Sequence, residues 1–323
     1  MSRRDHRRFD FVVEVRSVDA STRMVELFLR PDPRRYEWRN RRGERMLYDK
    51  FDDVYLAEDV LAQFARQARG MPITYDAGRL EPGGAPEYIK SRKQVIRESF
   101  VDGAEHSPNR FADKGEEFLE ALAGNELGFA ILSLDVVGST ALATSLGSRE
   151  YRSLLSASLF EWSEAVPLFN GHVLKYTGDG LIAYFAEPSF MRKMDLAIDC
   201  ALTLRGLLHD ALNLVFREQG LPSLAIRVGI DAGEAFVDVV GSPQTKRHAD
   251  LVGDVVSLAS KIQAQAPPDQ IFLGASVVQN LHVSWREKCE LVEVPDDWPY
   301  ETKDGAPYRF YRYATGQRYT SAG

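Results

Sequence analysis

The chain has 323 residues, of which 44% are hydrophobic, so it can bury one large core or two modest ones. Its formal net charge of −7 argues against wholesale nucleic-acid binding. The two cysteines, Cys200 and Cys289, lack disulfide-framework or zinc-site spacing, and no apolar run approaches the roughly 20 residues that a membrane span needs. We therefore expect a cytoplasmic protein with neither nucleic acid nor membrane as a partner.

Residues 1–124 carry weak patterns. Alternating apolar residues in 9–15 and 24–29 predict a β-hairpin. A helix is predicted over 57–67, and the glycines and prolines of 78–86 predict an exposed loop. Because none of these segments has a catalytic signature, we treat 1–124 as an N-terminal α/β extension of unknown role.

Residues 125–323 follow a more regular pattern, which predicts a single catalytic domain. In chain order we expect a buried strand at 127–134, a long helix at 139–169, a hairpin at 172–176 and 181–185, a helix at 191–217, a second hairpin at 224–230 and 235–240, a helix at 255–264 and a strand from 270 to 272. This order is that of an α+β, ferredoxin-like split βαβ sandwich with one sheet face covered by helices.

The end of the first strand of this domain combines a carboxylate with a helix start. Asp135 ends the strand, and Gly138, Ser139 and Thr140 begin the following helix. Backbone amides and the positive end of a helix dipole favour a polyphosphate, and a carboxylate beside them can hold its metal ion. An aspartate before Gly-Ser-Thr is also a common helix start, so the pattern alone leaves both interpretations open.

A second carboxylate, Asp179, stands at the tip of the first hairpin, in the stretch KYTGDG at 175–180. Asp-Gly is a favoured turn pair, so a purely structural role would also explain it. If the strand that carries Asp135 neighbours this hairpin, the two carboxylates meet at one end of the sheet. They could then hold two magnesium or manganese ions about 4 Å apart, the geometry used for in-line displacement at phosphorus.

Four motifs recur in the order and spacing of one known family: LDVVGST at 134–140, KYTGDG at 175–180, VGIDAG at 228–233 and DLVGD at 250–254. The segment from Phe129 to about Asn280 resembles the catalytic domain of class III adenylate and guanylate cyclases. The resemblance implies conversion of a nucleoside triphosphate to a 3′,5′-cyclic monophosphate and pyrophosphate. It also implies two Mg²⁺ or Mn²⁺ ions per site and a head-to-tail homodimer with active sites at the interface.

The same resemblance assigns roles to individual residues. Asp135 and Asp179 match the two metal-binding aspartates, and the backbone carbonyl of Val136 would complete the metal contacts. The amides of Gly138, Ser139 and Thr140 would contact phosphate. Lys303 loosely matches a terminal lysine that binds phosphate in the family, although a solvated turn lysine fits this position equally well.

The resemblance assigns base recognition to Lys175 and Asp250, which match the base-selecting pair of adenylate cyclases. Lysine donates and aspartate accepts, so together they read an adjacent acceptor and donor on a base edge, which adenine, cytosine and uracil all offer. Two positions depart from the family: Ser257 and Lys261 replace an asparagine that orients the ribose and an arginine that steadies the charged phosphorus. We expect these two residues to hold ribose and phosphate differently.

These departures favour a changed substrate, as in the bacterial pyrimidine (uridylate and cytidylate) cyclases of anti-phage Pycsar signalling, which this chain resembles most. We expect UTP, then CTP, as substrate, and a separate effector protein that senses the cyclic product. An adenylate cyclase is the alternative, since Lys175 and Asp250 would serve ATP unchanged. A catalytically silent nucleotide-binding homodimer is a third hypothesis.

Other polar residues near these motifs have simpler interpretations. We interpret His172 and His248 as surface or core-edge residues, since a metal-activated mechanism needs no histidine base. Asp231, which follows a predicted strand, is interpreted as a turn residue before Gly233.

Overall fold

The computed structural model describes residues 10–19, 24–57, 84–102, 115–186, 190–242, 244, 247–302 and 304–315. The chain divides into two compact units, one of Met1–Asp76 with His282–Ser284 and one of Ala77–Leu281 with Trp285–Gly323. The helix predicted at 57–67 falls, from residue 58 on, outside the described residues, as does Lys303. Within the described ranges, no helix is long and apolar enough to cross a membrane.

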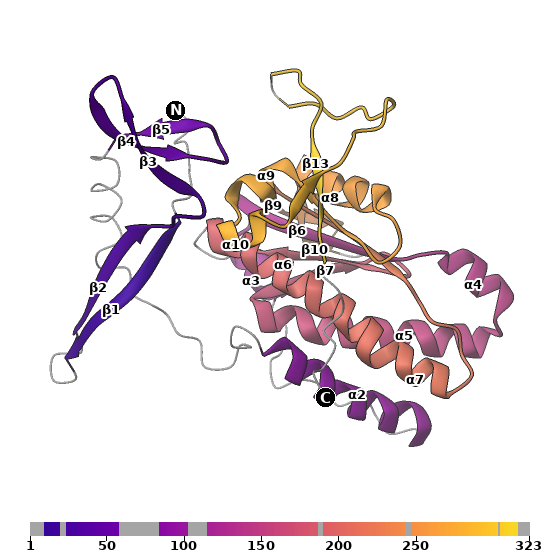
Figure 1. Cartoon of the computed structure of the whole chain (residues 1–323). Helices are drawn as coiled ribbons and strands as arrows, with labels where there is room; N and C mark the ends of the chain where they lie inside the picture. Colours follow the sequence, from indigo (N-terminus) through magenta and orange to yellow (C-terminus); the bar gives the residue numbers. More distant parts are fainter. Residues whose placement is uncertain are drawn as a thin grey trace. The chain divides into compact units, whose positions relative to one another are not determined.

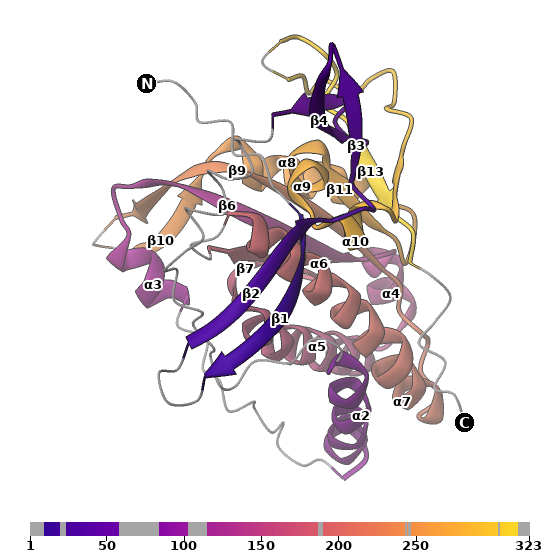
Figure 2. The ribbon, with the colours of Figure 1, turned by 60° about the vertical axis from the view of Figure 1, so that its left-hand side comes forward.

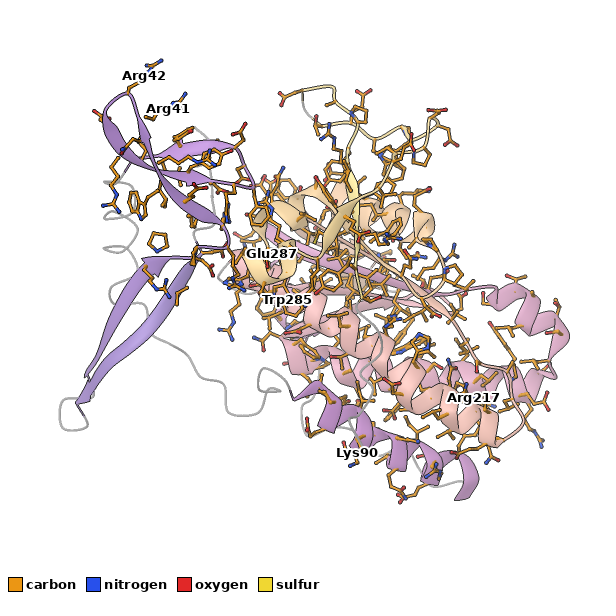
Figure 3. The ribbon with its side chains drawn as sticks, in the orientation of Figure 1. Arg41, Arg42, Lys90, Arg217, Trp285 and Glu287 are labelled. Atoms are coloured by element: carbon orange, nitrogen blue, oxygen red, sulfur yellow. The ribbon has the colours of Figure 1, made fainter. Side chains whose placement is uncertain are left out.

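The first unit contains two small antiparallel sheets. In one, β1 (Phe11–Asp19) pairs with β2 (Met24–Pro31), which confirms the predicted hairpin. The other joins β3 (Tyr36–Arg41), β4 (Glu44–Asp49) and β5 (Val54–Leu56). We did not predict these three strands because charged side chains occupy most of their exposed positions; Arg41 and Arg42 lie at the turn between β3 and β4 (Figure 3).

A buried arginine organises this three-stranded sheet. Arg35 is 1% exposed, and its guanidinium forms ion pairs with Asp10 at 3.0 Å, Asp49 at 2.8 Å and Asp52 at 2.9 Å. A buried guanidinium is tolerated only when its charge and its N–H donors are matched. Three carboxylates from two segments, one at residue 10 and one at 49–52, provide that match and fix the two segments to each other.

The second unit is built on an eight-stranded sheet with the order β12-β13-β11-β9-β6-β8-β7, in which β10 also pairs with β9. Its strands are β6 (Glu126–Val136), β7 (Gly171–Tyr176), β8 (Leu181–Phe185), β9 (Ile226–Gly241), β10 (Arg247–Val252), β11 (Ile271–Gly274), β12 (Cys289–Leu291) and β13 (Phe310–Tyr313). The central strand, β6, pairs antiparallel with β8 and with β9. The strand that carries Asp135 is therefore the neighbour of the hairpin that carries Asp179, as the site prediction required.

The helices of this unit are α2 (Ala85–Asp102), α3 (Gly115–Ala121), α4 (Ser139–Ser145), α5 (Ser148–Ala165), α6 (Phe190–Leu207), α7 (Asn213–Glu218), α8 (Asp254–Gln265), α9 (Ala275–Asn280) and the second half of α10 (Val283–Arg286), with a 3₁₀ turn at Val166–Phe169 and a π-helical turn at Leu208–Leu212. Alternate residues of β6 face opposite layers: Leu132 and Leu134 pack with α5 and α6, and Phe129 and Ile131 with α3 and α8. Helices thus cover both faces of the sheet, whereas we predicted one covered face.

Three predicted elements have other bounds in the structure. The helix predicted at 139–169 is broken between α4 and α5 at Gly147, whose N–H donates to the Glu150 carboxylate at 3.2 Å. The second predicted hairpin is wrong, because 226–241 form one continuous strand, of which 226–236 pair with β6. Pro86, predicted in a loop, stands in the first turn of α2, where its missing N–H interrupts no helical hydrogen bond.

Helix α2 lies along α6 and α7, on the α5 and α6 side of the sheet (Figures 1 and 2). Its Ile89 and Ile96 belong to the main core, and its buried Arg92 forms a bidentate ion pair with buried Glu161 of α5, with both distances 2.7 Å. Lys90 of α2 and Arg217 of α7 are exposed (Figure 3). Residues 85–102 and 115–121, which we assigned to the N-terminal extension, therefore pack with the second unit. The start of the catalytic domain at residue 125 stays a prediction.

Candidate active site

The structure brings Asp135 and Asp179 together at one end of the sheet. Asp135 lies next to the last residue of β6, and Asp179 lies in the turn between β7 and β8. Gly180 permits this contact, since a Cβ there would lie 2.0 Å from the carbonyl oxygen of Leu134 and 3.0 Å from Cα of Asp135. The turn thus touches the end of β6 directly.

The electrostatics of this pair favour a bound cation. Burial raises the pKa of Asp135, and the charge of Asp179 and a hydrogen bond with it raise that pKa further, while Arg227 opposes both effects. Two carboxylates that share a site repel each other unless a positive charge lies between or beside them. The pair is therefore suited to an ion with a strong positive charge and oxygen ligands.

Arg227 is a site residue that the sequence reasoning missed. It is the cross-strand partner of Asp135 in the β6–β9 register, and its Nη2 donates to Asp135 Oδ2 at 3.0 Å. Its position in the sequence could have indicated a role in the site, because Arg227 directly precedes the motif VGIDAG. Only the antiparallel pairing of β9 with β6 places it beside the carboxylates, where it adds a fixed positive charge.

The donor set fits magnesium or manganese. Within the described residues no group of three or more His, Cys, Asp or Glu could hold a metal ion, so the chain offers a carboxylate pair rather than a closed cage. Mg²⁺ usually binds through one or two carboxylates and completes its shell with water and substrate phosphate. The carbonyl of Val136, at the end of β6, stays a predicted additional ligand.

The predicted phosphate segment begins a short helix. Gly138 is the N-cap of α4, with a φ of 69°, and no side chain caps the helix. The amides at Ser139 and Thr140 are therefore not capped by a side chain. Because α4 has seven residues rather than the long helix we predicted, any phosphate contact would depend on these individual amides more than on a large helix dipole.

The structure also brings together the predicted base-reading residues. The ammonium of Lys175 donates to Asp250 at 2.8 Å and 3.2 Å, although β7 and β10 are not neighbours in the sheet. Asp250 also accepts from the backbone N–H of Leu251 at 2.8 Å, which fixes its carboxylate. A donor and an acceptor are thus held side by side; their role in base recognition stays a prediction.

A cavity of about 660 Å³ lies beside Lys175 and is lined by Lys175, Tyr176, His248 and part of α3. Helix α3 is anchored there by Tyr184, whose hydroxyl donates to the carbonyl of Gly115 at 2.8 Å, and by the buried Leu119. A segment outside the motif-bearing region therefore forms one wall of the cavity. Nothing in its sequence pattern indicated that position.

Ser257 and Lys261 lie one turn apart on α8 and are both exposed. In the described part of the chain, neither makes a hydrogen bond or ion pair with the two aspartates of the metal site or with Lys175 and Asp250. Lys303 lies outside the described residues. The structure of one chain therefore does not assemble all the residues that we predicted for the site.

Asp231 is a buried strand residue, so its interpretation as a turn residue is wrong. It lies in the middle of β9, is 1% exposed and accepts a hydrogen bond from the hydroxyl of Tyr308 at 2.6 Å. Burial raises the pKa of Asp231 to about 7. A Cβ at Gly274 would lie 2.1 Å from its Oδ1, so glycine leaves the room that this carboxyl occupies.

Comparison with known proteins identifies the family of the second unit. The family model described as the adenylate and guanylate cyclase catalytic domain matches residues 127–304, which is more than half of the chain. The chain belongs to this family. The match spans Asp135, Asp179, Lys175 and Asp250, and it begins six residues after the end of α3.

Several curated proteins resemble this cyclase-family chain. A cytidylate cyclase of Escherichia coli is 26% identical over 194 residues, covering 57% of this chain and 40% of that protein. A cytidylate cyclase of Staphylococcus aureus is 25% identical over 220 residues (60% and 51%), and an adenylate cyclase of Anabaena cylindrica is 28% identical over 187 residues (54% and 36%). The chain thus spans about half or less of the length of these relatives.

Two solved structures show the fold. The adenylyl cyclase CyaB from P. aeruginosa has a TM-score of 0.52 at 21% identity, covering 58% of this chain and 94% of that one. The guanylyl cyclase Cya2 has a TM-score of 0.51 at 21% identity, covering 61% and 98%. The predicted α+β class III cyclase fold is confirmed.

Proposed function

We propose that this protein is a nucleotidyl cyclase that converts a pyrimidine nucleoside triphosphate to its 3′,5′-cyclic monophosphate and pyrophosphate. The proposed substrate is UTP in preference to CTP. The observation that carries the proposal is the contact between Asp135 and Asp179 at the end of the sheet, in a domain of the cyclase family. Similarity to two cytidylate cyclases supports the pyrimidine substrate.

In this reaction the ribose 3′-oxygen bonds to the α-phosphorus, the bond from that phosphorus to pyrophosphate breaks, and the 3′-hydroxyl proton leaves to solvent. Two divalent cations, when bound, supply Lewis acidity to the 3′-hydroxyl and neutralise the triphosphate. Asp135 and Asp179 would hold them, and Arg227 would fix the orientation of Asp135. Lys175 and Asp250 would orient the base, so that the 3′-oxygen meets the α-phosphorus in line.

A homodimer completes the site in this proposal. Ser257 and Lys261 are exposed and take no part in the carboxylate site of their own chain, so a second copy would bring them to it. Apolar surface supports the contact: Phe236 and Val252 face each other across the β9–β10 pair and are 51% and 50% exposed, and Tyr176 is 55% exposed. Apolar side chains of this size are usually covered by a partner when they cluster.

Mixing two inactive variants tests the shared site. Asp135→Ala and Lys261→Ala copies, each inactive alone, should recover about a quarter of wild-type activity when dimers form at random, because half of the dimers then hold one intact site. No recovery in a mixture shown to exchange subunits would refute a site built from two copies.

The first experiment is to incubate the purified protein with ATP, GTP, CTP and UTP in turn, with Mg²⁺ or Mn²⁺, and to identify the products by mass spectrometry. Cyclic UMP or cyclic CMP as the main product supports the proposal. Cyclic AMP would support the second candidate, an adenylate cyclase, which the contact between Lys175 and Asp250 also favours. Tight triphosphate binding without pyrophosphate release would indicate a silent nucleotide-binding homodimer.

The biological role that we propose is anti-phage signalling through a separate effector that senses the cyclic product. Cells that carry the wild-type protein should accumulate a cyclic pyrimidine nucleotide on phage infection, whereas cells with Asp135→Ala should not. An unchanged cyclic nucleotide level in infected wild-type cells, with an active purified enzyme, would contradict this role and leave the cyclase activity standing.

A further inference from the structure

His248 lies beside the predicted base-reading pair. It precedes Asp250 by two residues in β10, so both side chains project from the same face of the strand. Its Nε2 is 3.9 Å from Asp250 Oδ2, and the same oxygen accepts from Lys175 at 2.8 Å. The carboxylate of Asp250 is therefore the shared neighbour of two nitrogen groups that can donate hydrogen bonds.

The imidazole also has unused hydrogen-bonding capacity. Its Nδ1 is shielded from solvent and has no hydrogen-bond partner in the described part of the chain, and its Nε2 is too far from Asp250 for a good hydrogen bond. Both His248 and Lys175 line the cavity of about 660 Å³, whose size is ordinary for a small-molecule site. A polar side chain in this state is poised for a ligand, since buried polar atoms are normally paired.

The order of these groups distinguishes the bases. Lysine, aspartate and histidine form the sequence donor, acceptor, donor around one carboxylate. Uracil presents the complementary sequence O4, N3–H and O2, that is, acceptor, donor, acceptor. Cytosine presents a donor, an acceptor and an acceptor, and adenine presents a donor, an acceptor and a C–H that forms no such bond. Only uracil offers all three complementary groups along its Watson–Crick edge. In cytosine and adenine the lysine and aspartate would take the ring nitrogen and the amino group, which leaves no acceptor for histidine on the aspartate side of that edge.

We infer that His248 is a specificity-determining residue that donates to O2 of uracil, and that Lys175, Asp250 and His248 together select UTP over CTP and ATP. The inference rests on the proposed cyclase function and deepens it by naming the base. If His248 only steadied Asp250, its removal would lower kcat/KM for all bases alike. The ratio of kcat/KM for UTP to kcat/KM for CTP or ATP therefore distinguishes the two roles.

The test compares His248→Val, which removes the donor at similar width, with His248→Gln, which keeps an N–H donor. Substrates are UTP, CTP, ATP and 2-thio-UTP, in which a poor acceptor replaces O2. We expect His248→Val to lower kcat/KM for UTP about tenfold to a hundredfold, with CTP and ATP changed less than threefold. Wild type should discriminate against 2-thio-UTP, His248→Val should not, and His248→Gln should recover part of the preference.

Measuring nucleotide binding without turnover distinguishes a wrong role for His248 from a wrong assignment of the cyclase activity. The dissociation constants of 3′-deoxy-UTP and 3′-deoxy-CTP, which cannot cyclise, are measured on the full chain by calorimetry. A uracil preference that His248→Val abolishes supports the inference even if no variant turns over any triphosphate. Equal loss for both ligands, or a preference that survives in His248→Val, overturns it even in an active cyclase.

Discussion

The close contact of Gly180 with the end of β6 predicts that Gly180→Ala separates the two metal-site carboxylates. The added Cβ would lie 2.0 Å from the carbonyl oxygen of Leu134, whereas real Cβ contacts are essentially never below 3.0 Å. Both contacting groups are backbone, so no side-chain rotation relieves the clash. The hairpin tip must therefore move by about 1 Å, and it carries Asp179 with it.

A displacement of that size should cost about a hundredfold in kcat, since catalytic geometry tolerates little error. Stability should fall by about 1–3 kcal/mol, the usual cost of overpacking. The assay is pyrophosphate release at saturating Mn²⁺, alongside thermal unfolding. Gly220→Ala is the matched control, because nothing lies within 4 Å of the Cβ added at Gly220, although its positive φ of 71° strains any side chain placed there.

Gly220→Ala should lose a comparable amount of stability through backbone strain while it keeps wild-type kcat. Wild-type kcat in a folded Gly180→Ala protein would refute the argument that this contact sets the position of Asp179.

Three further predictions concern charges. Asp135→Ala or Asp179→Ala should each lower turnover about a thousandfold or more with the fold intact, because each removes a metal ligand; a fully active single variant would refute the assignment. The raised pKa of Asp231 means that its stabilising contribution is complete below about pH 4 and is lost as the pH rises to about 7. Asp231→Asn should therefore flatten the fall in Tm between pH 5 and pH 8, a span over which the wild type loses up to about 3 kcal/mol; an equal fall in both proteins would contradict this. Arg92→Ala should destabilise by about 3–5 kcal/mol in urea titrations, because it leaves Glu161 buried without its partner, whereas Arg92→Met combined with Glu161→Leu should recover most of that loss; an equally unstable double variant would argue against it.

Local sequence patterns determined many of the strands, helices and turns of the cyclase domain. The apolar run that ends at Asp135 forms β6, and the glycines around Asp179 form the turn of the β7–β8 hairpin, because these signals depend on near neighbours in the chain. The pairing of Lys175 with Asp250 followed from motif order, since the resemblance to class III cyclases already contained their relation. Helix α8 and strand β11 were likewise predicted within a residue or two.

Only the tertiary structure decided which distant residues meet. Arg227 reaches Asp135 because β9 runs antiparallel to β6 in one particular register, and a shift of one residue would turn it to the other face. We predicted a hairpin instead of the long β9 because Asp231 and Gly233 are typical turn residues. Gly229, within the same strand, admits the backbone of α8, at 2.3 Å from where its Cβ would be.

The contributions of α2 and α3 also depended on the fold. Ile89 and Leu119 carry no periodic signal strong enough to assign a partner, yet one enters the main core and the other closes the cavity beside Lys175. His248 by itself looked like an ordinary surface histidine, and only the fold shows that it lies beside Asp250. The sequence thus determined the local elements and the kinds of functional group present. Packing between residues tens of positions apart decided which of these groups share a site, because contact free energy depends on distance in space and not along the chain.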